Sequence, residues 1–449
     1  MRLMENIFSC SPSRKYALPG RTLLQEEQLL WPDLYACALR IFSGRQHRTL
    51  CFFVLSWCDR PIQRVSTALK YRFRQEKRND EAFEDIYDGL EYQRLCLPGK
   101  FLEEWFNFSM TFNTDGCQIL KSTKTSAWPV YAQINELLPH MRKKYVLLAA
   151  VYVGDKHPKM NNLLRSFTLQ MKELFTNRIT WNPTPTSEVT SRFVVLASTL
   201  DAPARAAVLR MKQYNGYFSC LRTDKKLKAA MKFVTKTLEI RNGVKGYSSL
   251  TALSLFSITK GVIVETMHSV FLGTVKLHTT ILIKSTGAPY YIGNQETLDV
   301  INETLLSIKP PSRRSRKPRK IQSYAQWKAL DWCNWLDYAS ICLSSVLDIK
   351  YVNHLSLLSK AIHYLNSDSL ILAELNRTDT LLKEYAQLLE EYFGEVKMSS
   401  NIHSLSHVIE YETSTVELHN KFVVQKENKA RSLSAEENQA LFDAGYTPE

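Results

Sequence analysis

Two aspartates stand where the sequence predicts that a strand ends. Asp115 follows the segment 105–114 (WFNFSMTFNT), in which large apolar residues alternate with polar ones, and Asp201 follows the apolar run 193–200 (FVVLASTL). Alternation with a period of two is typical of a half-buried strand, and a short apolar run fits a fully buried one. Acidic residues at neighbouring strand ends can share a metal ion, and their hard oxygen atoms suit Mg²⁺ or Mn²⁺. Two such ions about 3.5–4 Å apart activate a nucleophilic oxygen and stabilise a leaving oxygen, so the pair indicates phosphodiester chemistry.

Each aspartate also has a local structural alternative. Asp115 precedes Gly116, and an Asp-Gly pair favours a tight turn because glycine tolerates positive φ. Asp201 precedes Ala202 and Pro203, which is the pattern of an N-cap ahead of a helix with proline in its first turn. Turn and cap aspartates are common, so the residues alone leave both alternatives open.

The predicted elements around the aspartates form an α/β unit. The Asp-Gly turn and the following CQILK predict a hairpin with the strand in 105–114. A buried strand is predicted at 145–154, and an amphipathic helix at 160–175, where apolar residues recur every three or four positions. With the strand at 193–200 the order is hairpin, strand, helix, strand, and an aspartate ends the first and the fourth strand. Ribonuclease H-like folds have this arrangement, so we predict a ribonuclease H-like mixed sheet.

Past residue 250 the sequence turns largely helical. Apolar residues recur with helical spacing over 324–347, 352–370 and 377–393, which indicates a mainly helical insertion or second domain. The expected division is an N-terminal segment of unknown role at 1–70, the first part of the ribonuclease H-like core at 71–248, a mainly helical insertion domain at 249–400 and a divergent C-terminal tail at 401–449.

The chain of 449 residues carries a formal net charge of +14 and has a pI near 9.2. Such an excess of cations favours a polyanionic partner, nucleic acid in particular, and a solvated basic surface is the simple alternative. The nine cysteines are too irregularly spaced for the framework of a disulfide-rich secreted protein. The longest apolar stretches fall short of the ~20 residues needed to cross a bilayer. We therefore expect a soluble intracellular protein in a reducing compartment, with no membrane partner.

A basic run follows two prolines. RRSRKPRK (313–320) places six cations in eight positions, and their mutual repulsion predicts an exposed loop. The functional interpretations are a nuclear import signal or a contact to the DNA backbone, and the alternative is a solvated linker. The candidate nucleic-acid contacts are Arg313, Arg314, Arg316, Lys317, Arg319 and Lys320.

Six ordered motifs resemble one known family. FNTDGCQILKSTKTSAWPVYAQINELLP, TLDAPARAAVLRMKQYNGYFSC, NGVKGYSSL, ETMHSVFLG, PYYIGNQETLDVINETLLSIKPPS and WKALDWCNWL resemble, in this order, the catalytic region of DDE-type transposases of the CACTA and Kyakuja/Dileera/Zisupton kind. DIYDGLEYQRL (85–95) resembles the segment that precedes this region. The resemblance covers roughly residues 71–407, about three quarters of the chain.

The resemblance implies roles for both aspartates. Asp115 in NTDG and Asp201 in LDAPAR would correspond to the first two acidic ligands of a two-metal Mg²⁺ or Mn²⁺ site. It also implies DNA cleavage and strand transfer, DNA at transposon ends or derived sites as the partner, and a nuclear location. A second copy of the chain is a further candidate partner.

Two departures from the family concern other possible ligands. The family usually has a CxxC after the second Asp, whereas Cys220 is followed by Leu, Arg and Thr. With His403 and His407 it leaves three candidate ligands for a structural Zn²⁺, which needs four; packing or capping is the alternative for the histidines. Glu265 stands where the family has the Asp of DxMH. Glu265 and His268 would share a helix face, and a structural role there is the alternative to one near the metals.

The third departure lies in the tail. The family continues into GPLW and an FxFE segment whose Glu completes the catalytic triad, and neither motif follows NIHSLSH here. Glu427 stands near the expected distance and Glu410, Glu412 and Glu417 are closer, but each is better explained as a solvated helix carboxylate. We therefore predict a catalytically impaired copy. The alternatives are a non-catalytic transposase-derived DNA-binding or interaction protein, and a gene fragment without stable function.

Overall fold

A computed structural model of the chain describes residues 42–44, 47–51, 68–73, 79, 81–118, 126–184, 186–212, 224–264, 267–310, 316–367 and 369–409. The described residues form two compact units, which meet in the sequence between Val264 and Glu265. We expected a boundary between 248 and 249. The observed boundary lies later because α9 (Ile258–Gly261) and β11 (Val262–Val264) pack with the sheet of the first unit.

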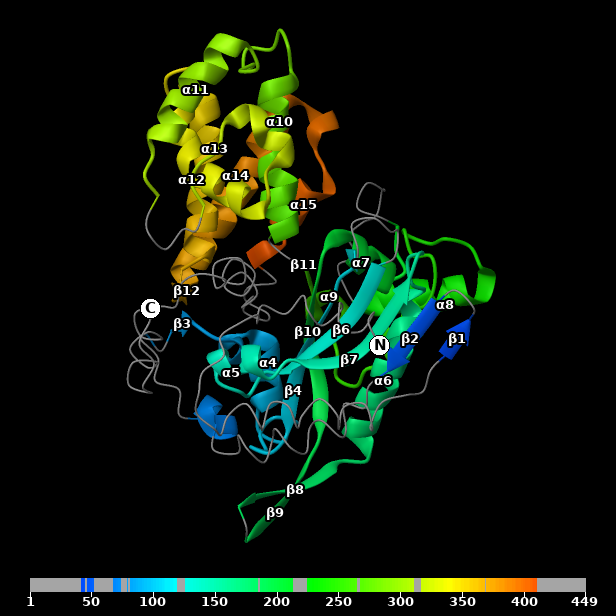
Figure 1. The fold of residues 1–449 in the computed structure, drawn as a ribbon. Helices are drawn as coiled ribbons and strands as arrows, with labels where there is room; N and C mark the ends of the chain where they lie inside the picture. Colours follow the sequence, from blue (N-terminus) through cyan, green and yellow to red (C-terminus); the bar gives the residue numbers. More distant parts are fainter. Residues whose placement is uncertain are drawn as a thin grey trace, which may run out of the picture. The chain divides into compact units, whose positions relative to one another are not determined.

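The first unit is built on a mixed sheet. Its strands are β1 (Phe42–Gly44), β2 (His47–Cys51), β4 (Phe108–Thr114), β5 (Cys117–Gln118), β6 (Ser126–Ile134), β7 (Leu147–Gly154), β10 (Phe193–Leu200) and β11. They lie in the order β1-β2-β7-β6-β4-β10-β11, and β5 pairs with β6 (Figure 1). β10 is parallel to both β4 and β11, whereas the pairs from β1 to β4 are antiparallel. The mixed sheet and the predicted strands at 145–154 and 193–200 are thus confirmed.

The predicted hairpin at Asp115 is wrong. β5 pairs with β6, not with β4, and Thr114 pairs with Val130 as Cys117 pairs with Ala127. Both pairs belong to one continuous register, because Cys117 lies three positions after Thr114 and Ala127 lies three positions before Val130. The chain therefore runs straight on along β6 across Asp115 and Gly116. The partner strand β6 was not predicted; it contains Pro129, and proline within sheets is usually confined to edge strands, strand starts and bulges.

A long helix covers the core of this unit. α6 (Met160–Thr176) packs against β7 and β10 and buries Leu163, Leu164, Phe167, Met171 and Leu174. The amphipathic helix predicted at 160–175 is therefore confirmed, and the reason is local: its apolar residues recur on one face.

The remaining elements of the first unit are short, apart from one further helix. Between α6 and β10 the chain forms an antiparallel ribbon of β8 (Ile179–Thr184) and β9 (Ser187–Ser191), which extends away from the sheet (Figure 1). The others are η1 (Ala68–Phe73), β3 (Ala82–Phe83), η2 (Ile86–Asp88), α4 (Leu90–Cys96), α5 (Pro139–Lys144), α7 (Ala202–Val208), α8 (Asp224–Thr237) and η3 (Ser249–Ala252).

The second unit is mainly helical in its described residues. Its elements are η4 (Met267–Val275), α10 (Lys276–Lys284), α11 (Gln295–Ser307), η5 (Ile321–Gln326), α12 (Ala329–Leu343), α13 (Ile349–Leu365), β12 (Leu370–Ile371), α14 (Leu372–Phe393), η6 (Glu395–Lys397) and α15 (Ser400–Leu405). α13 packs against both α12 and α14, around buried side chains that include Trp332, Trp335 and Tyr385. Of all helices described in the two units, none is long and apolar enough to cross a membrane.

Candidate metal site at the edge of the sheet

Asp115 and Asp201 follow two neighbouring parallel strands. In the pairing of β4 with β10, Asn113 lies opposite Thr199, and each aspartate comes two residues after its member of this pair. The amide of Asn113 also donates to the carbonyl oxygen of Thr199 at 2.7 Å, which ties the strands together just before they end. Because the two strands are parallel and pair as far as Asn113 and Thr199, the register brings the two aspartates to one level, where β10 ends and β4 continues into β5.

Asp201 also performs the local role foreseen for it. Its Oδ1 accepts a hydrogen bond of 2.6 Å from the backbone N–H of Ala204, so it is the N-cap of α7. A carboxylate has about four lone-pair positions, so this single bond leaves capacity for a metal ion. Asp201 is half-buried, and the cap fixes the orientation of its carboxylate.

Asp115 is exposed and does not form the turn that its Asp-Gly sequence suggested. The glycine after it has another function. A Cβ on Gly116 would lie 2.4 Å from Cζ2 of Trp128, so only glycine lets the indole lie against the backbone at this point. The indole in turn contacts His157, with ring centroids 4.3 Å apart. Close packing on β6, and not a positive φ, therefore explains the glycine beside Asp115.

Acidic residues follow all three parallel strands in the sequence. Leu200 on β10 pairs with Val264, the last residue of β11, and the next residues are Asp201 and Glu265. Glu265 itself lies outside the described residues. Within the described ranges, no cluster of three or more His, Cys, Asp or Glu side chains could hold a metal ion. The oxygen chemistry of Asp115 and Asp201 nevertheless fits Mg²⁺ or Mn²⁺.

The residues of the suggested zinc site are only partly described. The rings of His403 and His407 lie 5.1 Å apart at the end of α15, in the second unit. His268 is half-buried in η4 of the same unit. Cys220 lies outside the described residues, as do the four candidate third carboxylates Glu410, Glu412, Glu417 and Glu427.

Two arginines of the basic run bind within the protein. Arg316 Nη1 and Arg319 Nη1 lie 3.1 and 3.6 Å from Oδ2 of Asp331, a buried residue in the first turn of α12. The described part of the run, 316–320, has no regular secondary structure, as predicted, but it is anchored by these ion pairs. Lys317 and Lys320 are exposed. The remaining cations, Arg313 and Arg314, lie outside the described residues.

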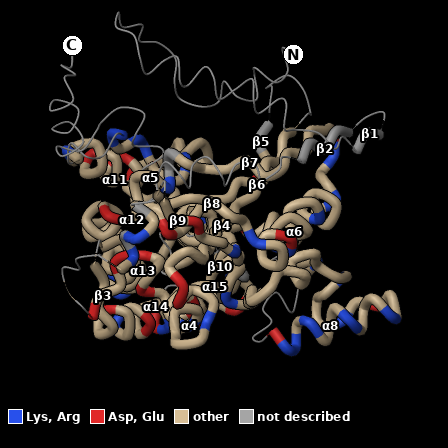
Figure 2. The backbone as a smooth tube through the Cα atoms, turned by 90° about the horizontal axis from the view of Figure 1, so that it is seen from below, with Lys and Arg blue, Asp and Glu red and all other residues tan. Residues whose placement is uncertain are grey.

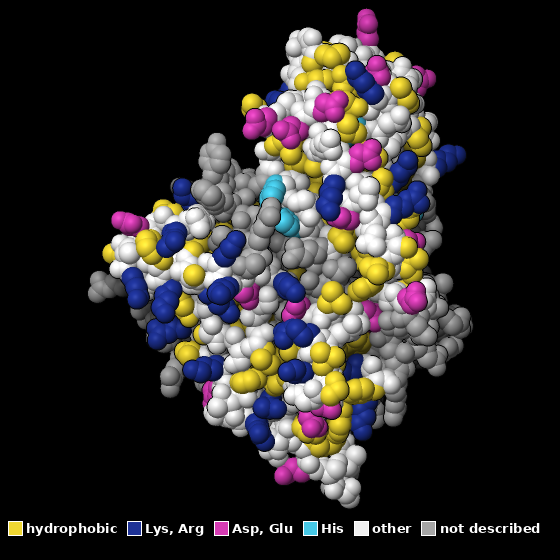
Figure 3. Space-filling view, turned by 180° about the vertical axis from the view of Figure 1, so that it is seen from behind, with side chains coloured by type: hydrophobic (Ala, Val, Ile, Leu, Met, Phe, Trp, Pro, Cys, Tyr) yellow, Lys and Arg dark blue, Asp and Glu magenta, His cyan; other side chains and the backbone are white. Residues whose placement is uncertain are grey.

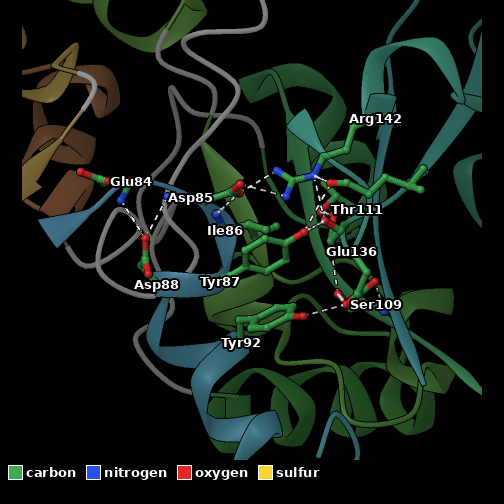
Figure 4. Close-up of polar contacts among 12 residues, drawn as sticks. Glu84, Asp85, Ile86, Tyr87, Asp88, Tyr92, Ser109, Thr111, Glu136 and Arg142 are labelled. Atoms are coloured by element: carbon green, nitrogen blue, oxygen red, sulfur yellow. Dashed lines mark hydrogen bonds and ion pairs between the residues drawn. The ribbon is translucent and has the colours of Figure 1, made fainter. Parts of the chain in front are cut away.

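A buried ionic network at the opposite end of β4 was missed by the sequence argument. Arg142 Nη1 and Nη2 donate to the carboxylate of Asp85 at 2.6 and 3.0 Å, and its Nε donates to the carbonyl oxygens of Asn135 and Leu137 (Figure 4). The hydroxyl of Tyr87 also donates to the Asn135 carbonyl. Burial raises the pKa of Tyr87, so its hydroxyl stays protonated and remains a donor.

The second half of this network surrounds Glu136. Its carboxylate accepts hydrogen bonds from the hydroxyl of Tyr92 and from the backbone and hydroxyl of Ser109 (Figure 4). Arg72 Nη1 lies 3.6 Å from its Oε1. Burial raises the pKa of Glu136, and Arg72 and the Ser109 bonds oppose the shift. Perturbed pKa values also occur in structural ion-pair networks. Since Glu136 is completely buried and hydrogen-bonded, we assign the network to fixing η2 and α4 on the sheet.

A buried histidine pair lies among the helices of the second unit. His278 Nδ1 lies 2.9 Å from the hydroxyl oxygen of Tyr385, and His354 Nε2 lies 2.8 Å from the Tyr385 carbonyl oxygen. Burial lowers the pKa of His278 well below its ordinary value and that of His354 to about 4. Both rings are therefore neutral at pH 7 and belong to the packing of α10, α13 and α14.

Comparison of the chain with protein-family models and with curated proteins finds no match.

Proposed function

We propose that the first unit has a ribonuclease H-like fold, and that the chain is a transposase-derived DNA-binding protein with a metal-binding pair of aspartates. The fold proposal is supported by the element order β4, β6, β7, α6, β10 and by the aspartates that follow the first and the fourth of these strands. The family proposal rests on the six motifs of the sequence. A net charge of +14 favours DNA as the partner.

One observation carries the metal site: Asp115 and Asp201 follow neighbouring parallel strands at the same level. The two carboxylates would hold Mg²⁺ or Mn²⁺, which supplies charge stabilisation to the attacking and leaving oxygens of a phosphodiester. Asp201 is oriented by its cap bond to α7, so the strand ends, and not a flexible loop, determine where its carboxylate lies.

Binding of Mn²⁺ by the full chain tests this site. We expect Asp115→Asn and Asp201→Asn each to weaken Mn²⁺ binding at least tenfold in calorimetry, because each removes a charged ligand. Asparagine is as good an N-cap as aspartate, so the second variant keeps α7 intact. The matched control is Asp155→Asn, which changes an exposed aspartate after β7, separated from β4 by β6. Unchanged Mn²⁺ affinity in both test variants would refute the site.

The proposed present-day activity is DNA binding with little or no strand cleavage. Correct placement of two metal ions needs a further anchoring ligand, and a misplacement of about 1 Å can cost about a hundredfold in rate. The FxFE segment that supplies this ligand in the family is missing from the sequence. A nicking and end-joining assay on terminal-repeat DNA with Mg²⁺ or Mn²⁺ should therefore show no product. Robust cleavage that disappears in Asp115→Ala would contradict the impaired state.

A further inference from the structure

The strongest concentration of positive charge in the described part of the first unit is α8 with the loop after it. Residues 224–245 contain seven Lys or Arg and two Asp or Glu, a difference of +5 out of the +14 of the whole chain. All seven cations are exposed. Lys and Arg recur along α8 in Figure 2. Figure 3 is turned by 180° from Figure 1, so α8, which lies on the right in Figure 1, comes to the left, where Lys and Arg side chains gather. This surface lies outside the basic run 313–320.

Four of the five lysines of α8 form one stripe. Lys225, Lys228, Lys232 and Lys236 are three or four residues apart, so they share a helix face. At 1.5 Å per residue the stripe is about 16 Å long. A strand of duplex DNA carries one phosphate per ~3.4 Å of helix axis, so the stripe is long enough to contact more than one phosphate of a strand.

The helix is held rigidly in the unit. At its start, the carboxylate of Asp224 accepts hydrogen bonds from the backbone N–H groups of Ile258 and Thr259 at the start of α9. After its end, the backbone N–H of Lys212 donates to the carbonyl oxygen of Gly243, which ties the loop to the segment after α7. The stripe therefore has a fixed orientation in the unit that carries Asp115 and Asp201.

The opposite face of α8 is used by the core. Leu227, Ala230, Met231 and Val234 are buried, so the helix cannot insert an apolar face into a lipid surface. The only aromatic residue of α8 is Phe233, whose ring is contacted by the guanidinium of Arg241 at 4.4 Å. Proteins that bind single strands combine cations with exposed aromatic rings on which bases stack. A straight row of lysines without such rings suits the regular backbone of a duplex.

We propose that the lysine stripe of α8, with Arg241 and Lys245 beyond it, is a docking surface for the phosphate backbone of duplex DNA. The inference rests on the proposed DNA binding and adds the surface that performs it. The contacts would be independent of base sequence, since lysines paired with phosphates carry no base information.

The test compares two variants of the full chain that lose the same charge. The stripe variant is Lys225→Gln with Lys232→Gln and Lys236→Gln; Lys228 is kept because it forms an ion pair with Asp224. The control replaces three exposed lysines of the second unit by glutamine in the same way. They are Lys276, Lys284 and Lys350. Fluorescence anisotropy with a labelled duplex of about 30 base pairs measures the dissociation constant at several salt concentrations, and thermal unfolding checks that both variants are folded.

We expect the stripe variant to bind the duplex roughly 100-fold more weakly at ~0.1 M salt. The slope of log affinity against log salt should become shallower by about 2.7, because each of the three lost phosphate contacts contributes about 0.9. The control should stay within about threefold of the unchanged chain. If the two variants weakened duplex binding equally, the stripe would not be the DNA surface. The same holds if the stripe variant lost binding to anionic vesicles but kept its binding to the duplex. In both cases the chain would still bind DNA. If the unchanged chain does not bind the duplex at all, the proposed function fails and this inference fails with it.

Discussion

Removal of Arg142 should destabilise the first unit strongly. The side chain donates two hydrogen bonds to Asp85 and two to backbone carbonyls, and Asp85 is only 3% exposed. In Arg142→Met the carboxylate stays buried without its counter-charge, and breaking a buried ion pair in this way typically costs about 3–5 kcal/mol. This is a large part of the about 5–15 kcal/mol that stabilises an ordinary domain.

The assay is urea unfolding followed by circular dichroism, with hydrogen exchange of β4 and β6 amides to assign the change to the first unit. The matched control is Arg94→Met, whose ion pair with Glu91 is 2.9 Å long but leaves the arginine side chain 48% exposed. That pair should contribute about 0–1 kcal/mol. The double variant Asp85→Asn with Arg142→Met should be less unstable than the sum of its single changes, because no buried charge remains. A loss below about 1 kcal/mol in Arg142→Met would refute the structural role of the network.

Three further predictions concern local packing, capping and pH. Gly116→Ala should cost about 1–3 kcal/mol in urea unfolding, because its Cβ would overlap the ring of Trp128; a neutral effect would mean that the indole moves freely. Asp201→Ala should cost about 0.5–2 kcal/mol and Asp201→Asn only a few tenths, since asparagine preserves the N-cap; equal losses would exclude the cap as the cause. The folded pKa of His354, about 4, lies below its ordinary 6.5, so the unfolded chain binds the extra proton. The contribution of His354 to the free energy of unfolding should therefore be fully present above pH 6.5 and fall by up to about 1.4 kcal/mol per pH unit towards pH 4, and His354→Asn should have a shallower slope.

Local periodicity was sufficient to predict much of the fold. The strands at 145–154 and 193–200 and the helix at 160–175 are present because each buries its apolar residues in a pattern that is visible within one element. The two aspartates were also correctly placed after their strands. Their shared level could not be read from the sequence, because it depends on the register between β4 and β10, whose paired residues are 85 or 86 positions apart.

Other features depend on partners that are distant in the sequence. The Asp-Gly pair at 115 suggested a turn, but the pairing of the following residues with β6 overrides this local preference. β6, which contains Pro129, and the short strands β8 and β9 were not predicted from the sequence. The ionic network joins Asp85 to Arg142 across 57 residues, and a charged residue in a sequence gives no sign that it is buried.

The ionic network and the aspartate pair occupy opposite ends of one strand. Ser109, which contacts Glu136, and Asp115 are six residues apart on and just after β4, or about 20 Å at ~3.3 Å per residue. Selection on folding and selection on the proposed metal site would therefore act through different residues. If the proposed cleavage activity were lost, changes could accumulate at Asp115, Asp201 and in the tail, while Ser109, Glu136 and Arg142 would still be needed for folding.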